Sequence, residues 1–183
     1  MPPKQRITRE MILESSFTMF CQEGMEVVNA RSVAKALNCS TQPIFSYFAG
    51  MDDLKTALQD KARTLFEARI EAALQSDEPF FSACKAYFQF AMDYPHLFRQ
   101  MFLLKREKQE ETLAAINAAL REKAILPLQA KNGEDVGVIE RQCLKLWAYT
   151  HGLASLQAMG LLDVPAQDVE AMLREAEQQF RMA

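Results

Sequence analysis

Apolar residues recur at intervals of three and four along most of this chain, the spacing that places them on one face of an α-helix. Proline, glycine and short polar stretches separate these segments, as expected at helix ends. The pattern predicts an all-α protein of about nine helices. We place them over residues 8–23, 30–37, 41–48, 52–75, 79–94, 95–104, 105–127, 136–161 and 165–181.

Specific residues near position 30 mark a short helix that ends in a tight turn. Asn29 is a good N-cap residue, so the helix is expected to begin at Ala30. Val28, just before the cap, is expected to pack against Val33 in a hydrophobic staple. The helix then stops at Asn38, because asparagine tolerates the left-handed backbone of a tight turn better than other non-glycine residues.

A second short helix follows this turn directly. Either Ser40 or Thr41 is expected to cap it, and Pro43 suits its first turn, where a missing N–H is tolerated. Its buried side is expected to consist of Ile44, Phe45 and Phe48. Two helices joined in this way are typical of a helix-turn-helix, whose second helix lies in the DNA major groove with its N-terminal residues at the base edges.

These helices lie within an ordered set of motifs. The motifs are Arg9-x-x-Ile12, Phe20-x-x-x-Gly24, Val33-Ala34-x-x-Leu37-Asn38-Cys39-Ser40-x-x-Pro43-Ile44-Phe45-Ser46-Tyr47-Phe48 and Asp53-Leu54. Together they resemble the DNA-binding domain of the TetR family of bacterial regulators, over about the first third of the chain. The resemblance implies a three-helix DNA-binding domain in residues 1–51, followed by a larger helical domain for ligand binding and dimerisation in residues 52–183.

Three positions depart from the family pattern. Asn38 replaces the usual turn glycine, and Phe45 replaces a usual tyrosine, which removes a hydroxyl but keeps the ring. Met51 stands where the family usually has a lysine at the start of the fourth helix. Lys55, one turn later, is the candidate substitute for that phosphate contact.

The predicted DNA-binding residues are Arg31, Ser40, Thr41, Gln42, Pro43, Ser46, Tyr47 and Lys55. Gln42 can bind adenine through its side-chain amide, and Thr41 can bind a base or contact a thymine methyl group. Tyr47 and Arg31 are expected to contact phosphates, which position a protein without reading sequence. Two plainer interpretations stay open: Ser40 or Thr41 only caps the helix, and Tyr47 only packs.

Residues 79–104 form the densest aromatic segment, and Trp147 and His151 share a face of the helix over 136–161. A mostly apolar pocket with a few polar groups is how small-molecule sites are usually built. The predicted binding residues for a small, largely apolar effector are Phe88, Met92, Phe98, Met101, Phe102, Trp147 and His151. The alternative is that the aromatic residues form ordinary core and that His151 is a hydrogen-bonded core histidine.

The helix over 136–161 is apolar on nearly all sides, so it must be covered on all sides. Its small residues Ala148, Gly152 and Ser155 would let another helix approach closely. The helix over 165–181 has one apolar face. We therefore predict a homodimer in which these two helices of each chain form a four-helix bundle. The alternative is an internal core helix in a monomer.

A second, shorter resemblance concerns the C-terminal half. It rests on Pro95-His96-Leu97-Phe98-Arg99-Gln100-Met101-Phe102, followed by Trp147-Ala148-x-x-His151-Gly152-Leu153. This pattern is similar to the C-terminal subtype of the TetR family that is named for its Trp-x-x-x-His-Gly motif. It implies a helical ligand-binding and dimerisation domain.

The net charge of −3 argues mildly against a nucleic-acid partner, because DNA-binding domains often carry a basic excess. The basic residues Lys4, Arg6 and Arg9 precede the first acid and form either an arm that reaches DNA or a solvated tail. The low basic charge and Met51 favour a rival interpretation, a helical interaction protein that does not bind DNA. An enzyme is a weaker rival, since no metal cluster, phosphate loop or nucleophile motif is present in the sequence.

The four cysteines contain no C-x-x-C pair, so we expect reduced structural thiols, no metal and no cofactor. Residues 1–10 are polar and no apolar region follows, which predicts no signal peptide. Polar residues interrupt the most apolar stretch, 144–162, so we expect a buried helix there and no membrane span. The resemblance and these exclusions imply a cytoplasmic, ligand-responsive repressor that binds a palindromic DNA operator as a dimer.

Overall fold

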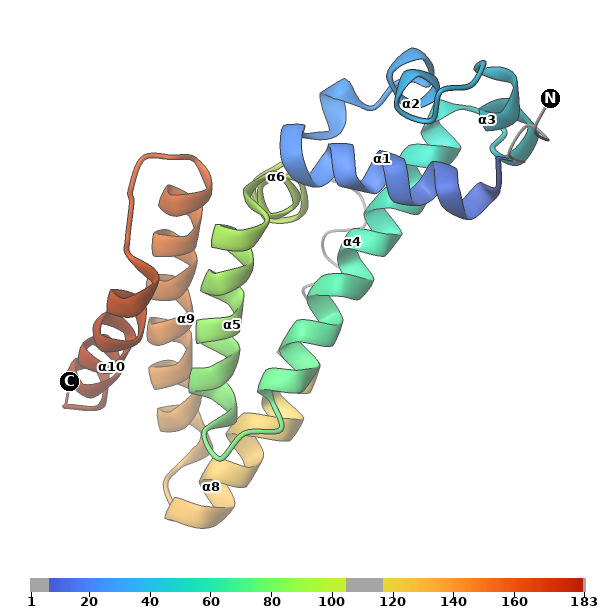
Figure 1. Cartoon of the computed structure of the whole chain (residues 1–183). Helices are drawn as coiled ribbons and strands as arrows, with labels where there is room; N and C mark the ends of the chain where they lie inside the picture. The colour runs from blue at the N-terminus through green and yellow to red at the C-terminus, as the bar shows by residue number, and fades with distance from the viewer. Residues whose placement is uncertain (1–6, 105–116, 183) are drawn as a thin grey trace. The chain divides into compact units, whose positions relative to one another are not determined.

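The computed structural model of the chain describes residues 7–104 and 117–182. Every regular element in these two ranges is helical, which confirms the predicted all-α class (Figure 1). The α-helices are α1 Arg9–Glu23, α2 Ala30–Ala36, α3 Gln42–Tyr47, α4 Met51–Ala73, α5 Pro79–Asp93, α6 Pro95–Phe98, α8 Leu126–Asn132, α9 Val136–Ala158 and α10 Ala166–Met182. Three shorter helical turns are η1 Met25–Val27, η2 Arg99–Leu103 and η3 Arg121–Ile125.

The chain forms two compact units, Met1–Thr64 and Leu65–Ala183. The helix α4 continues across the boundary between them. Within the described residues, no helix is both long and apolar enough to cross a membrane.

In the first unit, α1 begins and ends at the residues that the sequence indicates. The Met11 N–H donates to the Thr8 hydroxyl oxygen at 3.2 Å, which caps the start of the helix. Gly24 ends it with a φ of 98°, a backbone conformation that favours glycine. Of the predicted apolar face, Phe20 is fully buried, whereas Leu13 and Phe17 are half-buried.

The short helix α2 forms as predicted. The Asn29 side chain accepts hydrogen bonds from the N–H groups of Arg31 and Ser32, both at 3.1 Å, and so caps the helix. Asn38 then adopts a left-handed backbone with a φ of 49°, which confirms its role in the tight turn.

Helix α3 follows this turn, with Pro43 in its first turn as predicted. Thr41 is the N-cap residue, one of the two that were predicted, but its side chain makes no capping hydrogen bond, so the predicted side-chain contact is wrong. Ile44 and Phe48 are buried, whereas Phe45 is 51% exposed and its predicted burial is also wrong. The reason is helix periodicity: Ile44 and Phe48 are four positions apart and share one face, while Phe45 lies about 100° away from Ile44.

In the second unit, α5 lies beside α9, and α10 packs against both of these helices (Figure 1). An aromatic core joins α4, α5 and the segment that follows α6. In it, Phe66 contacts Tyr87, Phe90 and Phe102, with ring centroids 5.0 to 5.8 Å apart. Arg174 of α10 lies 3.5 Å from the centre of the Phe81 ring of α5, which joins these two helices by a cation–π contact.

The predicted end of a helix near Pro127 is wrong, because the chain stays helical from Asn117 through Asn132. Proline has no N–H to donate to the preceding turn. The wide turn η3 lies just before it, closed by the Leu126 N–H donating to the Arg121 carbonyl, and α8 then begins with the proline in its first turn. The predicted charged run 105–111 and two apolar residues of the same predicted helix, Leu113 and Ile116, lie outside the described residues.

The last two helices form where the sequence places them. The Asp135 carboxylate accepts a hydrogen bond from the Gly137 N–H at 2.9 Å and so caps α9. One face of α9 is buried against α5 and α10, while Leu144 is 65% exposed on the other face. The other described residues therefore leave part of the apolar surface of α9 uncovered.

Candidate functional site

The predicted DNA-reading residues lie on and around the exposed side of α3. Ser40, Gln42, Ser46 and Tyr47 are exposed, whereas Thr41 and Pro43 are half-buried. The Ser46 hydroxyl donates to the Gln42 carbonyl at 3.0 Å, so its proton is engaged while its oxygen can still accept a bond. The Gln42 side-chain amide offers donor hydrogens and an acceptor oxygen side by side at its tip, as a bidentate contact with a base requires.

Tyr47 lies at the end of the same helix and has a specific structural partner. Its hydroxyl donates to the carbonyl oxygen of Ile7 at 3.2 Å, which joins α3 to the residues just before α1. A tyrosine hydroxyl has one proton, so Tyr47 cannot donate to a phosphate while this bond is intact.

The described basic residues of the first unit lie on α1, α2 and α4. Arg31 is exposed at the start of α2, and Lys55 is half-buried in the first two turns of α4. Arg9 begins α1, and its guanidinium carbon lies 4.9 Å from the centre of the Phe48 ring, so this arginine belongs to the folded unit and not to an arm. The other two residues of the predicted arm, Lys4 and Arg6, lie outside the described residues.

Most of the predicted ligand-binding residues lie in or near the aromatic core of the second unit. Phe88, Phe98 and Phe102 are buried, whereas Met92, Met101, Trp147 and His151 are half-buried. Four of them, Phe98, Phe102, Trp147 and His151, contact Tyr87, which the prediction left out. Its ring centroid lies 4.6 Å from that of Trp147 and 5.1 Å from those of Phe98 and Phe102. The signal for it was its position in α5 three residues before Phe90, a spacing that places both rings on one helix face.

His151 is hydrogen-bonded within this core. Its Nδ1 lies 2.9 Å from the Tyr87 hydroxyl, and its Nε2 lies 3.5 Å from the Ser155 hydroxyl. Burial lowers the pKa of His151 and raises the pKa of Tyr87. Both side chains are therefore neutral while they share this hydrogen bond.

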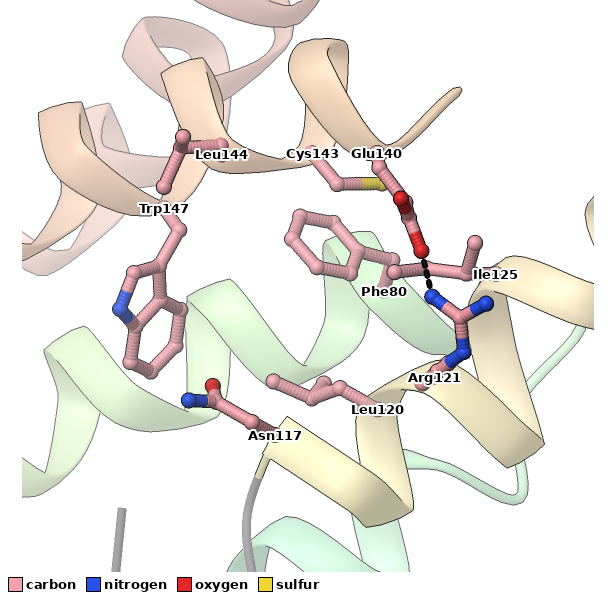
Figure 2. Close-up of a pocket in the computed structure, with 9 residues that line it drawn as sticks. All are labelled: Phe80, Asn117, Leu120, Arg121, Ile125, Glu140, Cys143, Leu144 and Trp147. Carbon is pink, nitrogen blue, oxygen red and sulfur yellow. Dashed lines mark ion pairs between the residues drawn. The ribbon is translucent and has the colours of Figure 1, made fainter. Parts of the chain in front are cut away.

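A cavity of about 310 Å³ lies next to the aromatic core, between α5, α9 and the helical segment from Asn117 to Ile125 (Figure 2). It is lined by Phe80, Asn117, Leu120, Arg121, Ile125, Glu140, Cys143, Leu144 and Trp147. Trp147 is the one predicted ligand-binding residue among them. The other eight were missed because they come from three separate parts of the chain, most of them outside the aromatic segment.

The wall of the cavity is mainly apolar and carries no unbalanced charge. Arg121 forms an ion pair with Glu140 at one side, so each cancels the charge of the other. Burial raises the pKa of the Cys143 thiol to about 11, which keeps this group neutral at physiological pH. Figure 2 shows the Asn117 amide near Trp147, on the side away from that ion pair. The cavity thus offers an apolar space with a neutral hydrogen-bonding group at one end.

Comparison with known proteins finds relatives that match both halves of the chain. Residues 80–180 match the family model described as tetracyclin repressor-like, C-terminal domain. The HTH-type transcriptional regulator Rv0681 of Mycobacterium tuberculosis is 23% identical over 164 residues, which cover 86% of this chain and 73% of that protein. The HTH-type transcriptional regulator YobS of Bacillus subtilis is 22% identical over 117 residues, which cover 62% of this chain and 61% of that protein.

Solved structures share the fold. A protein of unknown function from Rhodococcus sp. RHA1 superposes with a TM-score of 0.74 at 20% identity, over 100% of this chain and 98% of that one. The fatty acid degradation regulator FadR of Bacillus halodurans superposes with a TM-score of 0.64 at 16% identity, over 97% of each chain. Since the family model covers more than half of the chain, the protein belongs to the TetR family of tetracyclin repressor-like transcriptional regulators.

Proposed function

We propose that this chain is a ligand-responsive repressor that binds a palindromic DNA operator as a homodimer. The observation that carries the proposal is α3, a short helix that follows a capped helix and a left-handed turn and exposes Gln42 and Ser46. This is the arrangement of a helix-turn-helix, in which the second helix enters the major groove. Membership of the TetR family supports the same function.

Each predicted DNA-binding residue has a proposed role. Gln42 binds adenine through its side-chain amide, and Thr41 contacts a neighbouring base. Arg31 and Lys55 bind phosphates, which fix the position of the helix on the duplex. Tyr47 reaches a phosphate only by exchanging its bond to the backbone before α1. We assign further contacts with the duplex to Ser40, Pro43 and Ser46.

We assign DNA binding to residues 1–51 and ligand binding and dimerisation to residues 52–183. The helix α4 begins at Met51 and is continuous to Ala73, so it belongs to both compact units. It is therefore the element through which a change in one unit can reach the other.

The proposed dimer uses the face of α9 that the other described residues leave uncovered, within the predicted helices 136–161 and 165–181. The stripe on this face, which we call the α9 stripe, consists of Leu144, Ala148, Gly152, Leu156 and Met159, all exposed. A Cβ atom added at Gly152 would lie in open space, so the backbone is accessible at this point of the stripe. Covering this stripe with its copy from a second chain buries apolar surface that water otherwise contacts.

The proposed effector occupies the cavity beside Trp147. A volume of about 310 Å³ corresponds to roughly ten non-hydrogen atoms. The paired charges of Arg121 and Glu140 leave no counter-charge for an ionised ligand, which favours a neutral, mostly apolar molecule. Three other predicted residues, Phe98, Phe102 and His151, contact Tyr87, and Tyr87 contacts Trp147. They therefore help to fix the position of Trp147 in the cavity wall.

The effector would act by shifting a population of two states. It favours one state only through a higher affinity for that state. Lys123 of η3, between two cavity-lining residues, forms an ion pair with Glu71 of α4. Movement of η3 on ligand binding would thus reach α4, and α4 would change the separation of the two DNA-reading helices, which successive major grooves require to be about 34–36 Å.

We also assign the C-terminal half to the subtype named for the Trp-x-x-x-His-Gly motif. The support is the position of the motif residues Trp147 and His151, which both contact Tyr87 in the core. In this chain the motif therefore connects the cavity wall to α5.

The test of DNA binding starts from genomic fragments that the full-length protein retains. Recovery of a palindromic site is expected, and Gln42→Ala should lower affinity for that site by about 1–3 kcal/mol while leaving affinity for random DNA nearly unchanged. Gln22→Ala, at an exposed glutamine of α1, is the matched control and should change neither affinity. Equal losses on both DNAs would contradict base reading by Gln42, and a protein that retains no specific fragment would contradict the proposed function.

A further inference from the structure

The exposure of Phe45 gives α3 an apolar side chain that faces outward beside Gln42. Phe45 is 51% exposed, while Ile44 and Phe48 of the same segment are at most 2% exposed. It lies three residues after Gln42 and directly before Ser46, and all three side chains are exposed. Residues three apart on a helix are neighbours, so Phe45 and Gln42 share one face.

The chemistry of a phenyl ring restricts what Phe45 can do on DNA. It has no donor or acceptor, so it cannot hydrogen-bond a phosphate or a polar base edge. Among the groups that base pairs present in the major groove, the apolar one is the C5-methyl group of thymine. An apolar side chain that enters the groove therefore has one base partner with which burial is favourable.

We propose that Phe45 contacts the methyl group of a thymine in the operator and so adds a base preference to that of Gln42. The proposal rests on the proposed function, since it requires α3 to lie in the major groove. Side chains three apart on a helix lie about 5–6 Å apart at Cβ, and successive bases are about 3.4 Å apart. The thymine therefore lies within two base pairs of the adenine that Gln42 reads.

The test replaces each thymine of the selected operator, one at a time, by deoxyuridine, which removes only the methyl group. Binding of the full-length protein is measured at low ionic strength, so that weakened variants still bind. One replacement within two base pairs of the Gln42-dependent position should weaken wild-type binding about fourfold, the effect of burying one methyl-sized group. The same replacement should leave binding by Phe45→Ala unchanged.

Two variants serve as controls. Phe45→Tyr keeps the ring and should keep the dependence on the methyl group. Leu126→Ala removes an exposed apolar side chain of α8 and should also leave that dependence intact. A wild-type protein that binds every deoxyuridine operator as well as the thymine operator would overturn the inference, as would methyl dependence that persists in Phe45→Ala. Specific binding without methyl dependence would leave the proposed function standing, whereas the absence of any specific binding would overturn both.

Discussion

Tyr87 and His151 are two titratable side chains of the aromatic core, and a hydrogen bond joins them. Both groups are neutral in this bond, because burial disfavours the charged form of each side chain. Protonation of His151 would leave both of its ring nitrogens able only to donate. The pair therefore makes the second unit sensitive to mild acid.

We expect the free energy of unfolding to fall as the pH drops below about 6.5, the usual histidine pKa. Above that pH His151 is neutral in both the folded and the unfolded chain, so it adds no pH dependence. Below it the unfolded chain binds a proton that the folded chain resists, because the pKa of His151 is lowered in the fold. One proton gives at most about 1.4 kcal/mol per pH unit, and solvent screening reduces this at a half-buried site.

Urea unfolding at pH 7.5 and pH 5.5 measures this effect. His151→Gln, which keeps a polar side chain without a titrating ring, should lose less stability between the two pH values than the wild type does. His96→Gln is the matched control for removing a histidine elsewhere in the same unit. An equal loss in wild type and His151→Gln would show that other groups cause the pH dependence.

At the scale of elements, the cavity depends on η3, which brings Arg121 and Ile125 to its wall. We expect it to bind 4-tert-butylphenol, a neutral molecule of about the right size, and to bind 4-tert-butylbenzoate or 4-tert-butylbenzylamine at least tenfold more weakly. The reason is that an ionised group would lose water without gaining an opposite charge. Trp147 is the one tryptophan in the chain and lines the cavity, so its fluorescence reports binding directly.

The same fluorescence titration can locate the ligand. Leu120→Phe enlarges a side chain in the cavity wall and should abolish the response to the phenol. Leu126→Phe, which enlarges an exposed residue outside the wall, should leave it unchanged. Binding that survives Leu120→Phe, or equal binding of the ionised compounds, would contradict the proposed site.

Helix ends could be predicted from the sequence where one residue type decides the local backbone. This was the case at Asn29, Asn38 and Gly24, because capping and left-handed turns depend on the chemistry of a single residue. The helix end predicted near Pro127 was wrong, because the wide turn η3 accommodates the proline and the chain stays helical. The exposure of Phe45 was missed since an apolar residue type was taken as evidence of burial in a helix of only six residues.

The cavity could not be predicted in the same way. Its wall joins Phe80, Leu120 and Cys143, which are far apart in the sequence. Periodicity shows which side of a helix is apolar, but not whether the apolar sides of several helices fill the space between them. The sequence therefore indicated the aromatic segment and Trp147 as parts of a ligand site. The cavity beside them could be found only from the structure.

At the scale of the whole molecule, the α9 stripe predicts how the chain assembles. Gly152→Arg places a large charged side chain in the middle of that stripe and should convert the dimer to a monomer. Affinity for a palindromic operator should then fall roughly a hundredfold or more, because two linked half-site contacts become separate events. Sedimentation equilibrium and a binding titration measure the two effects.

Ala130→Arg, at an exposed position of α8, is the matched control for adding an arginine to a helix surface. It should leave both the oligomeric state and operator affinity unchanged. A Gly152→Arg protein that stays dimeric would show that the dimer uses another face.

Leu144 belongs to the cavity wall and to the α9 stripe at the same time. If that stripe is the dimer interface, the subunit contact and the ligand site share a side chain, and each binding event changes the free energy of the other by the same amount. The apparent affinity for a ligand would then depend on the protein concentration at which it is measured. The cellular abundance of this regulator would thus set the effector level to which it responds.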